Sequence, residues 1–218
     1  MKAGLTLNHN ADSEQFAIVD LPNSTTHSSP NSSNDSSPSS FRHMDSSTPQ
    51  QWEVIVNETI AHQSHMADQI LVFLRQLESI KTGFAINQLL HSLQTASRAE
   101  KSGTTNELIL ASLCHDIGKV ASILNHAQIS AEILRPYVSN DTYEVIGAHQ
   151  DFQGKHYYRY IGQDPDLRES YRDRPWFDLA EQFADDWDQS SFDPDYPTPK
   201  LSYYEPLVRE IFARPFGF

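Results

Sequence analysis

The fold of this chain is decided by residues 114–119, Cys114-His115-Asp116-Ile117-Gly118-Lys119, which end a run of apolar residues. Apolar residues recur here at helical spacing, so we expect a helix from Asn106 to about Val120. In that helix Asp116 shares a face with Leu113 and Val120. A carboxylate on an apolar face loses its water, which is costly unless a cation or several hydrogen-bond donors meet it. The stretch therefore indicates a buried helix with a cation near its end.

Helical periodicity continues on both sides of this stretch. It predicts one long helix or two joined helices from Gln51 to Leu77, then helices at about 85–100, 126–134, 139–149, 175–188 and 204–213. Thr104 or Thr105 is expected to cap the helix that starts at Asn106, and Ser139 or Asn140 the one that reaches His149. No run alternates with a period of two residues, so the predicted fold class is all-α, a helical bundle.

Composition divides the chain into two parts. Residues 1–50 are rich in serine and proline and poor in apolar residues, which predicts a disordered leader, and residues 51–218 are expected to form one helical domain. The formal net charge of −13 argues against nucleic acid or an anionic membrane as a partner. A lone cysteine, Cys114, and the absence of a secretory or membrane-spanning pattern favour a cytoplasmic location.

Further imidazole and carboxylate groups lie within the predicted helices or at their ends. His91 precedes His115 by 24 residues, His126 follows it by 11, His149 follows after a further 23, and Asp188 lies 39 beyond that. Such ligands suit iron, manganese and zinc, and a carboxylate such as Asp116 is able to bridge two ions. Helices that each deliver ligands to one centre are a known way to build a dinuclear site.

Each of these residues also has a purely structural explanation. An isolated His-Asp pair is usually accidental, and His91 lies on a helical face with Asn87, Gln94 and Arg98, a pattern typical of a solvated surface. His62 and His65, three residues apart in the first predicted helix, are interpreted as surface residues. The case for metal binding therefore depends on the order of all six residues together.

The segment from Ala85 to Pro215 resembles the HD-domain superfamily, and more closely its oxygenase branch, which includes myo-inositol oxygenase and the enzymes that cleave 1-hydroxyphosphonates. The resemblance is carried by His91-Ser92-Leu93-Gln94-Thr95-Ala96, His115-Asp116-Ile117-Gly118-Lys119, His126, Ala131-Glu132-Ile133-Leu134-Arg135-Pro136, His149, Phe152-Gln153-Gly154 and Trp187-Asp188-Gln189-Ser190-Ser191-Phe192-Asp193-Pro194.

This resemblance implies a diiron oxygenase. It implies a mixed-valent Fe(II)/Fe(III) pair that is bridged by Asp116, with substrate bound to one iron through a hydroxyl group and O2 to the other. The remaining implied ligands are His91, His115, His126, His149 and Asp188. The expected partners are a small hydroxylated substrate, neutral or anionic, and O2; no nucleic acid or membrane partner is expected, and the oligomeric state is left open.

Substrate contacts are implied less specifically. Lys119 matches a substrate-contacting lysine of the inositol enzyme and is assigned a catalytic and substrate-binding role; its alternative is a solvated lysine at a helix end. Gln153 and Lys155, which follow His149, are further candidates, with His156 and Arg159 beside them. The phosphonate enzymes carry an acidic residue shortly before the first histidine, and no acid occurs here between Glu78 and His91.

Two alternatives stay open from the sequence. A metal-dependent phosphohydrolase that acts on a nucleotide or phosphate ester would use the same six residues to activate water. A non-catalytic HD module that only binds a ligand would be expected to lack one of the metal-binding residues, and none is missing.

Overall fold

The protein is described by a computed structural model whose placed residues are 41–215, and these residues form helices and connecting turns without any strand. The α-helices are α1 (Pro49–Gln63), α2 (Met66–Gln76), α3 (Gln88–Lys101), α4 (Asn106–Cys114), α5 (His126–Leu134), α6 (Asn140–Gln153), α7 (Phe177–Gln182) and α8 (Leu201–Phe212). The all-α prediction is confirmed. No helix in this part of the chain combines the length and hydropathy that crossing a bilayer requires.

The predicted leader lies mostly outside the described residues. Of residues 1–50, only 41–50 are described, and they contain the 3-10 turn Met44–Ser46 and the start of α1. The α1 helix begins with a capping box, in which the Thr48 side chain accepts from the Gln51 amide and Gln51 accepts from the Thr48 amide. The division of the chain at residue 50 stays a prediction.

Helix starts are set by side-chain caps. The side chains of Asn87, Thr105 and Ser139 accept hydrogen bonds from the amides of Leu90, Leu108 and Thr142, at the starts of α3, α4 and α6. Of the alternatives that the sequence left open, the structure therefore selects Thr105 and Ser139.

The helix predicted from Asn106 to Val120 ends early, at Cys114, and this prediction was wrong in its extent. Asp116 adopts φ −106° and ψ 2°, and a 3-10 turn follows at Ile117–Val120. The amide of Gly118 donates to the Ser130 hydroxyl, a partner in α5, instead of continuing the helical pattern. Asp116 consequently leaves the face that Leu113 occupies and is free to point between the helices.

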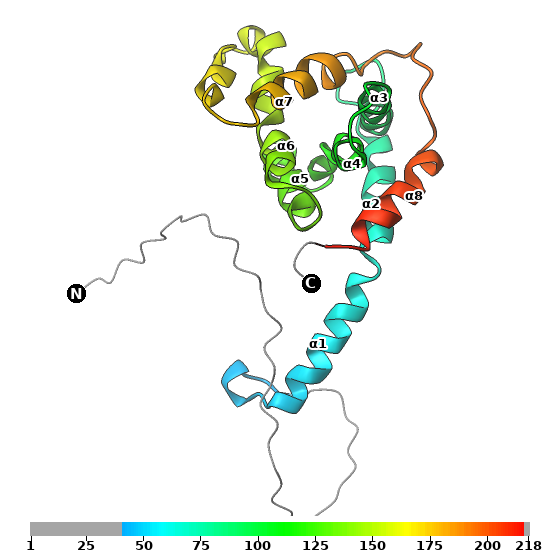
Figure 1. The fold of residues 1–218 in the computed structure, drawn as a ribbon, viewed down its shortest axis with the longest axis vertical. Helices are drawn as coiled ribbons and strands as arrows, with labels where there is room; N and C mark the ends of the chain where they lie inside the picture. Colours follow the sequence, from blue (N-terminus) through cyan, green and yellow to red (C-terminus); the bar gives the residue numbers. More distant parts are fainter. Residues whose placement is uncertain (1–40, 216–218) are drawn as a thin grey trace, which may run out of the picture.

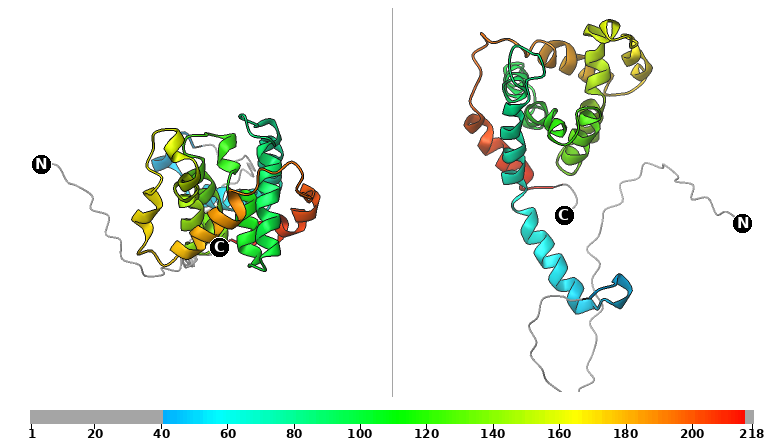
Figure 2. Two further views of the ribbon diagram at one scale, coloured as in Figure 1. Left: turned by 90° about the horizontal axis from the view of Figure 1, so that it is seen from above. Right: turned by 180° about the vertical axis from the view of Figure 1, so that it is seen from behind.

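The core lies between two helix pairs, α3 with α4 and α5 with α6, and α7 with the π-helical turn Phe183–Asp188 closes one side (Figures 1 and 2). The helices α2 and α8 pack side by side, α8 against α4 and α2 against α3 and the 3-10 turn Ile117–Val120. The largest fully buried side chains include Trp187, Phe152 and Phe183. The chain segment at Asp116 lies between the two pairs, where the buried Asp116 faces His91 of α3, His126 of α5 and His149 of α6.

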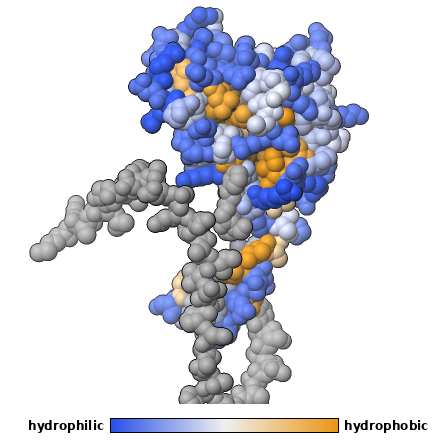
Figure 3. All heavy atoms as spheres, in the orientation of Figure 1, coloured by the Kyte–Doolittle hydropathy of each residue, from blue (hydrophilic) through white to orange (hydrophobic). Residues whose placement is uncertain are grey.

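The apolar stripe predicted from Gln51 to Leu77 divides between two helices that differ in burial. Ile70 and Leu74 of α2 are completely buried, whereas Trp52 and Ile60 of α1 are 40% and 63% exposed. The α1 helix extends away from the rest of the molecule in Figure 1, and apolar residues are visible on its surface in Figure 3.

A tight contact between the 3-10 turn after Asp116 and the start of α5 generates a prediction. A Cβ atom on Gly118 would lie 2.2 Å from the backbone oxygen of His126, so one of the two backbone segments would have to shift. We expect Gly118→Ala to destabilise the protein by about 1–3 kcal/mol because of overpacking. The measurement is denaturant unfolding followed by circular dichroism.

The matched control is Gly147→Ala, in the middle of α6. Its Cβ would lie 3.7 Å from the Ala131 side chain, an ordinary contact. Since alanine is favoured over glycine inside a helix, this variant should be stabilised by roughly 0.5–1 kcal/mol. Equal stability of the two variants would contradict the packing described for Gly118.

Candidate metal centre

Six buried side chains from different helices converge at the centre of the bundle. His91 lies in α3, His115 and Asp116 directly follow α4, His126 is the first residue of α5, His149 lies near the end of α6, and Asp188 ends the π-helical turn. None is more than 6% exposed. The six residues predicted from sequence as metal ligands are thus brought together in space.

All four histidines are held in the same way by the backbone. Each Nδ1 atom lies 2.7–2.8 Å from a backbone carbonyl oxygen, and the pairs are His91 with Ser191, His115 with Ser112, His126 with Ile123 and His149 with Ile146. A carbonyl only accepts hydrogen bonds, so each Nδ1 carries the proton and donates. The Nε2 atoms therefore present lone pairs to the centre, which is the orientation that metal-binding histidines adopt.

The Nε2 atoms of His91 and His115 lie only 3.1 Å apart. Two lone pairs facing each other at this distance in a buried site repel, and water has no space between them. A cation that both nitrogen atoms bind, either a proton or a metal ion, removes the repulsion. The donor arrangement therefore fits a metal ion.

The two carboxylates supply the negative charge that such an ion requires. Asp116 Oδ1 and both oxygens of Asp188 are buried without a hydrogen-bond partner among the described residues. Buried carboxylate oxygens are normally satisfied by donors, so unsatisfied ones indicate a missing positive partner. Two groups of side chains have ligand atoms close enough to share an ion: His91, His115 and Asp188, and His115, Asp116 and His149.

The two oxygen atoms of Asp116 face different histidines. Oδ2 lies 3.5 Å from His91 Nε2 and 3.4 Å from His115 Nε2. Oδ1 lies 3.2 Å from His126 Nε2 and 3.6 Å from His149 Nε2. Asp188 Oδ1 joins the first pair, at 3.0 Å from His91 Nε2. The carboxylate of Asp116 thus stands between two sets of nitrogen donors.

The local charges keep both carboxyl groups ionised. Burial alone would raise the pKa of Asp116, but in the metal-free protein positive charge on His115, from a proton in the place of a metal ion, and the charge of Lys119 outweigh burial and hold that pKa well below its ordinary value. In the same metal-free state burial opposes the ionisation of Asp188, and positive charge on His115 together with the hydrogen bond and charge of His91 lower its pKa. Both groups are therefore carboxylates at neutral pH and able to bind a cation.

Aromatic rings and a π-helical turn fix the positions of these ligands. Phe192 stacks on His91 with ring centroids 4.1 Å apart, and Phe183 meets the ring of His115 edge-on at 5.5 Å. The π-helical turn Phe183–Asp188 widens the end of α7, which turns Asp188 toward the centre. Such turns often occur at functional sites because they reorient a single side chain.

Lys119 connects this centre to a neighbouring cavity. Its ammonium group donates to Asp116 Oδ2 at 2.5 Å and to Gln88 Oε1 at 2.9 Å. With a side chain that is 16% exposed, Lys119 is not the solvated helix-end lysine considered as its alternative. Gln88, which the sequence reasoning did not identify, is buried in the first turn of α3, where only its spacing of three residues from His91 pointed to the site.

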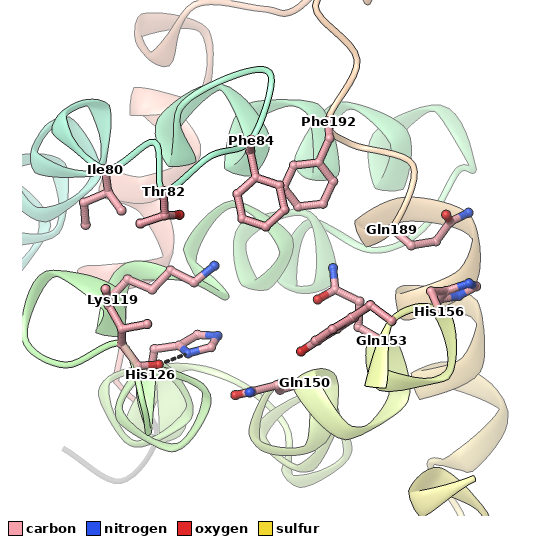
Figure 4. A pocket seen from close by; sticks show the side chains of 12 residues that line it. Ile80, Thr82, Phe84, Lys119, His126, Gln150, Gln153, His156, Gln189 and Phe192 are labelled. Carbon is pink, nitrogen blue, oxygen red and sulfur yellow. Dashed lines mark hydrogen bonds between the residues drawn. The ribbon is translucent and has the colours of Figure 1, made fainter. Parts of the chain in front are cut away.

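The cavity has a volume of about 430 Å³ and opens onto His126 and Lys119 (Figure 4). Its walls are formed by Ile80, Thr82, Phe84, Lys119, Ile123, His126, Gln150, Gln153, His156, Tyr157, Gln189 and Phe192. Gln153, predicted to contact substrate, lies in this lining. Lys155, also predicted, does not; its ammonium group lies 3.4 Å from Asp185 on the outer side of the turn.

Several lining residues were missed by the sequence reasoning because they come from loops. Phe84 lies in the connection between α2 and α3, and Phe192 follows the π-helical turn by four residues. Nothing in the local sequence pairs them, yet their rings stack with centroids 4.5 Å apart. His156, named only as a neighbour of Lys155, enters the wall with its ring held by Asp185 at 2.9 Å.

The lowered carboxyl pKa values predict how the metal-free protein responds to acid. Because folding lowers the pKa of Asp116 and Asp188 from the usual 3.8, ionised carboxylates stabilise the fold above about pH 4, and this stabilisation is lost as the pH falls further. We expect Asp116→Asn to flatten the acid limb of a stability–pH curve measured in chelator. The exposed Asp186→Asn is the control, and an unchanged acid limb in Asp116→Asn would contradict the described charge balance.

Similarity to a protein family covers the segment that holds this centre. No curated protein matches the chain. Residues 89–193, which contain the four histidines and two aspartates of the centre, match the family model of the HD domain.

Proposed function

We propose that this protein is a metal-dependent HD-domain enzyme whose six converging residues hold two ions, and that it is an oxygenase with an iron pair. In this proposal it uses O2 to oxidise or cleave a small hydroxylated substrate. The HD-domain match and the buried His/Asp cluster support the metal-dependent class. The two-ion site, the metal and the reaction are the parts that we propose.

The division of the histidines by Asp116 carries the proposal. One of its oxygens faces His91 and His115, and the other faces His126 and His149. A single ion would need only one of these sets, and the second would then remain an unexplained group of buried lone pairs. A carboxylate that bridges two ions uses both oxygens and accounts for all four histidines. Asp188 would complete the first set.

The few cations in the cavity favour a hydroxylated substrate over a phosphate ester, whereas the ligand types leave the metal open. Imidazole and carboxylate ligands suit iron, although they also suit manganese and zinc. A phosphate ester carries charge that such enzymes usually meet with several cations. Here Lys119 is the one lysine among the lining residues, no arginine lines the cavity, and the ammonium group is already paired with Asp116.

The protein residues would bind and orient the substrate beside the ions. A bound iron pair would supply the site for O2 and the one-electron chemistry that the side chains lack. Lys119 holds its proton at Nζ between Asp116 and the cavity, so it is placed to donate a hydrogen bond to a substrate oxygen at the metal end. The side chains of Lys119 and His126 at this end are 16% and 8% exposed, and the low local dielectric strengthens such a bond.

Metal analysis tests the two-ion site. We expect Asp116→Ala to lose both ions or nearly both, because its removal leaves two cations facing each other without a bridging charge. Lys119→Ala should keep both ions, since a protonated lysine is a poor metal ligand, and should weaken substrate binding instead. Lys155→Ala, outside the cavity, is the matched control and should change neither. If Asp116→Ala still held two ions per chain, Asp116 would not be the bridging ligand.

Oxygen dependence separates the two reaction classes. We expect anaerobically purified, iron-loaded protein to give a coupled mixed-valent electron paramagnetic resonance signal on partial oxidation. A chelating hydroxylated compound should perturb that signal, and turnover should consume O2. Phosphate release from esters under anaerobic conditions, sustained by redox-inert metal ions and without oxygen uptake, would instead establish a phosphohydrolase and leave the metal centre intact.

A further inference from the structure

We propose that the end of the substrate farthest from the metal centre is uncharged and has an apolar face, such as an aromatic or alkyl group beside neutral oxygen atoms. This inference rests on the proposed function and narrows its substrate from hydroxylated compounds in general to those with a neutral tail. It comes from the part of the cavity beyond Lys119 and His126, which the metal centre does not use (Figure 4).

One wall of this part of the cavity is apolar and leads to the metal centre. The rings of Phe84 and Phe192 stack at 4.5 Å with an interplanar angle of 18°, and Phe192 stacks in turn on His91 at 4.1 Å and 14°. Ile80 and Ile123 extend the apolar surface. Phe84 is 44% exposed, so part of its ring is in contact with solvent. An apolar group that enters the cavity would remove this surface from water, which is favourable.

The loop that carries Phe84 is held in an uncommon backbone conformation. Thr82 has a φ of 42°, the one positive value for a non-glycine residue in the described chain, and Gly83 follows with a φ of 88°. Positive φ costs free energy in a threonine, and such strain often occurs where a loop clamps a ligand. Together the two residues turn the chain so that Phe84 lies over the cavity next to Phe192 (Figure 4).

The opposite wall is polar but neutral. It presents the carboxamides of Gln150, Gln153 and Gln189 and the phenol of Tyr157. The Gln153 side chain makes no hydrogen bond to another residue of the described chain and points into the cavity (Figure 4). A carboxamide both donates and accepts, so this wall suits hydroxyl, carbonyl or ether oxygens. It offers no full charge to an ionic group.

The cations close to the cavity are already paired with carboxylates. The ammonium of Lys119 is bonded to Asp116. On the outer side, the Asp185 carboxylate contacts His156 at 2.9 Å, Lys155 at 3.4 Å and Arg168 at 3.1 Å. An anionic tail would therefore lose its water without gaining a free counterion, which is costly. No aspartate or glutamate is among the lining residues, so a cationic tail would be equally unmatched.

A series of 2-hydroxy acids with one shared head tests the tail directly. Glycerate, 3-phenyllactate, malate and 3-phosphoglycerate all carry the same hydroxyl and carboxyl groups and differ only in a hydroxyl, phenyl, carboxylate or phosphate tail. We expect 3-phenyllactate to bind the metal-loaded, full-length protein about tenfold or more tightly than malate and 3-phosphoglycerate, measured by calorimetry. The affinity for glycerate should lie between those for 3-phenyllactate and for the two acids with anionic tails.

Two variants assign the preference to the two walls. Phe84→Ala should weaken 3-phenyllactate several-fold and leave glycerate unchanged, because only the phenyl tail uses the ring. Gln153→Lys adds a cation to the neutral wall and should tighten malate and 3-phosphoglycerate about tenfold, with little change for glycerate. Unfolding curves of both variants confirm that they remain folded.

The outcomes separate this inference from the proposed function. Metal content is measured on every sample. A wild-type protein that binds no metal would contradict both the proposed function and this inference. Protein with two ions that binds malate or 3-phosphoglycerate as tightly as 3-phenyllactate, or that binds none of the four acids, overturns the inference alone. An unchanged preference in both variants would likewise overturn it, because the walls would then not select the tail.

Discussion

The structure depends on one buried carboxylate, that of Asp116, whose two oxygen atoms are surrounded by four imidazole nitrogens and one ammonium group. An ionised carboxylate inside a protein is tolerated only when positive charge or donors meet it from several directions. The groups that meet Asp116 come from several elements. His91 lies in α3, His126 starts α5 and His149 lies near the end of α6, whereas His115 and Lys119 precede and follow Asp116 in the chain after α4. The arrangement of the helices follows from bringing these groups to one point.

The backbone contributes as much to this centre as the side chains do. Four carbonyl groups fix the protonated nitrogen of each histidine and leave the other nitrogen facing inward. Three of these carbonyls precede their histidine by three residues, at Ser112, Ile123 and Ile146, so local chain geometry sets the orientation. Only His91 depends on a distant carbonyl, that of Ser191, which links α3 to the segment after Asp188.

The cavity and the metal centre share residues but differ in chemical character. The centre is dense in charge, whereas the cavity beside it combines stacked phenyl rings with neutral amides. Lys119 lies at the boundary and belongs to both, since its ammonium group contacts Asp116 while its side chain lines the cavity. A substrate that spans the two regions would have a polar head at the ions and a less polar remainder. The charges of the metal centre alone would not indicate this second part of the substrate.

Much of the fold could be predicted from the sequence because it depends on local spacing. Helical periodicity and the caps Thr105 and Ser139 are set by residues three or four positions apart, and the order of the six ligands could be recognised as a pattern. Tertiary contacts decided the rest. The hydrogen bond from Gly118 to Ser130 ends α4 early and frees Asp116, and the polar face around His91 is buried because the segment after Asp188 covers it. Phe84 stacks on Phe192, and Lys155 pairs with Asp185 instead of lining the cavity. Both contacts join residues far apart in the chain, so no local pattern encodes them.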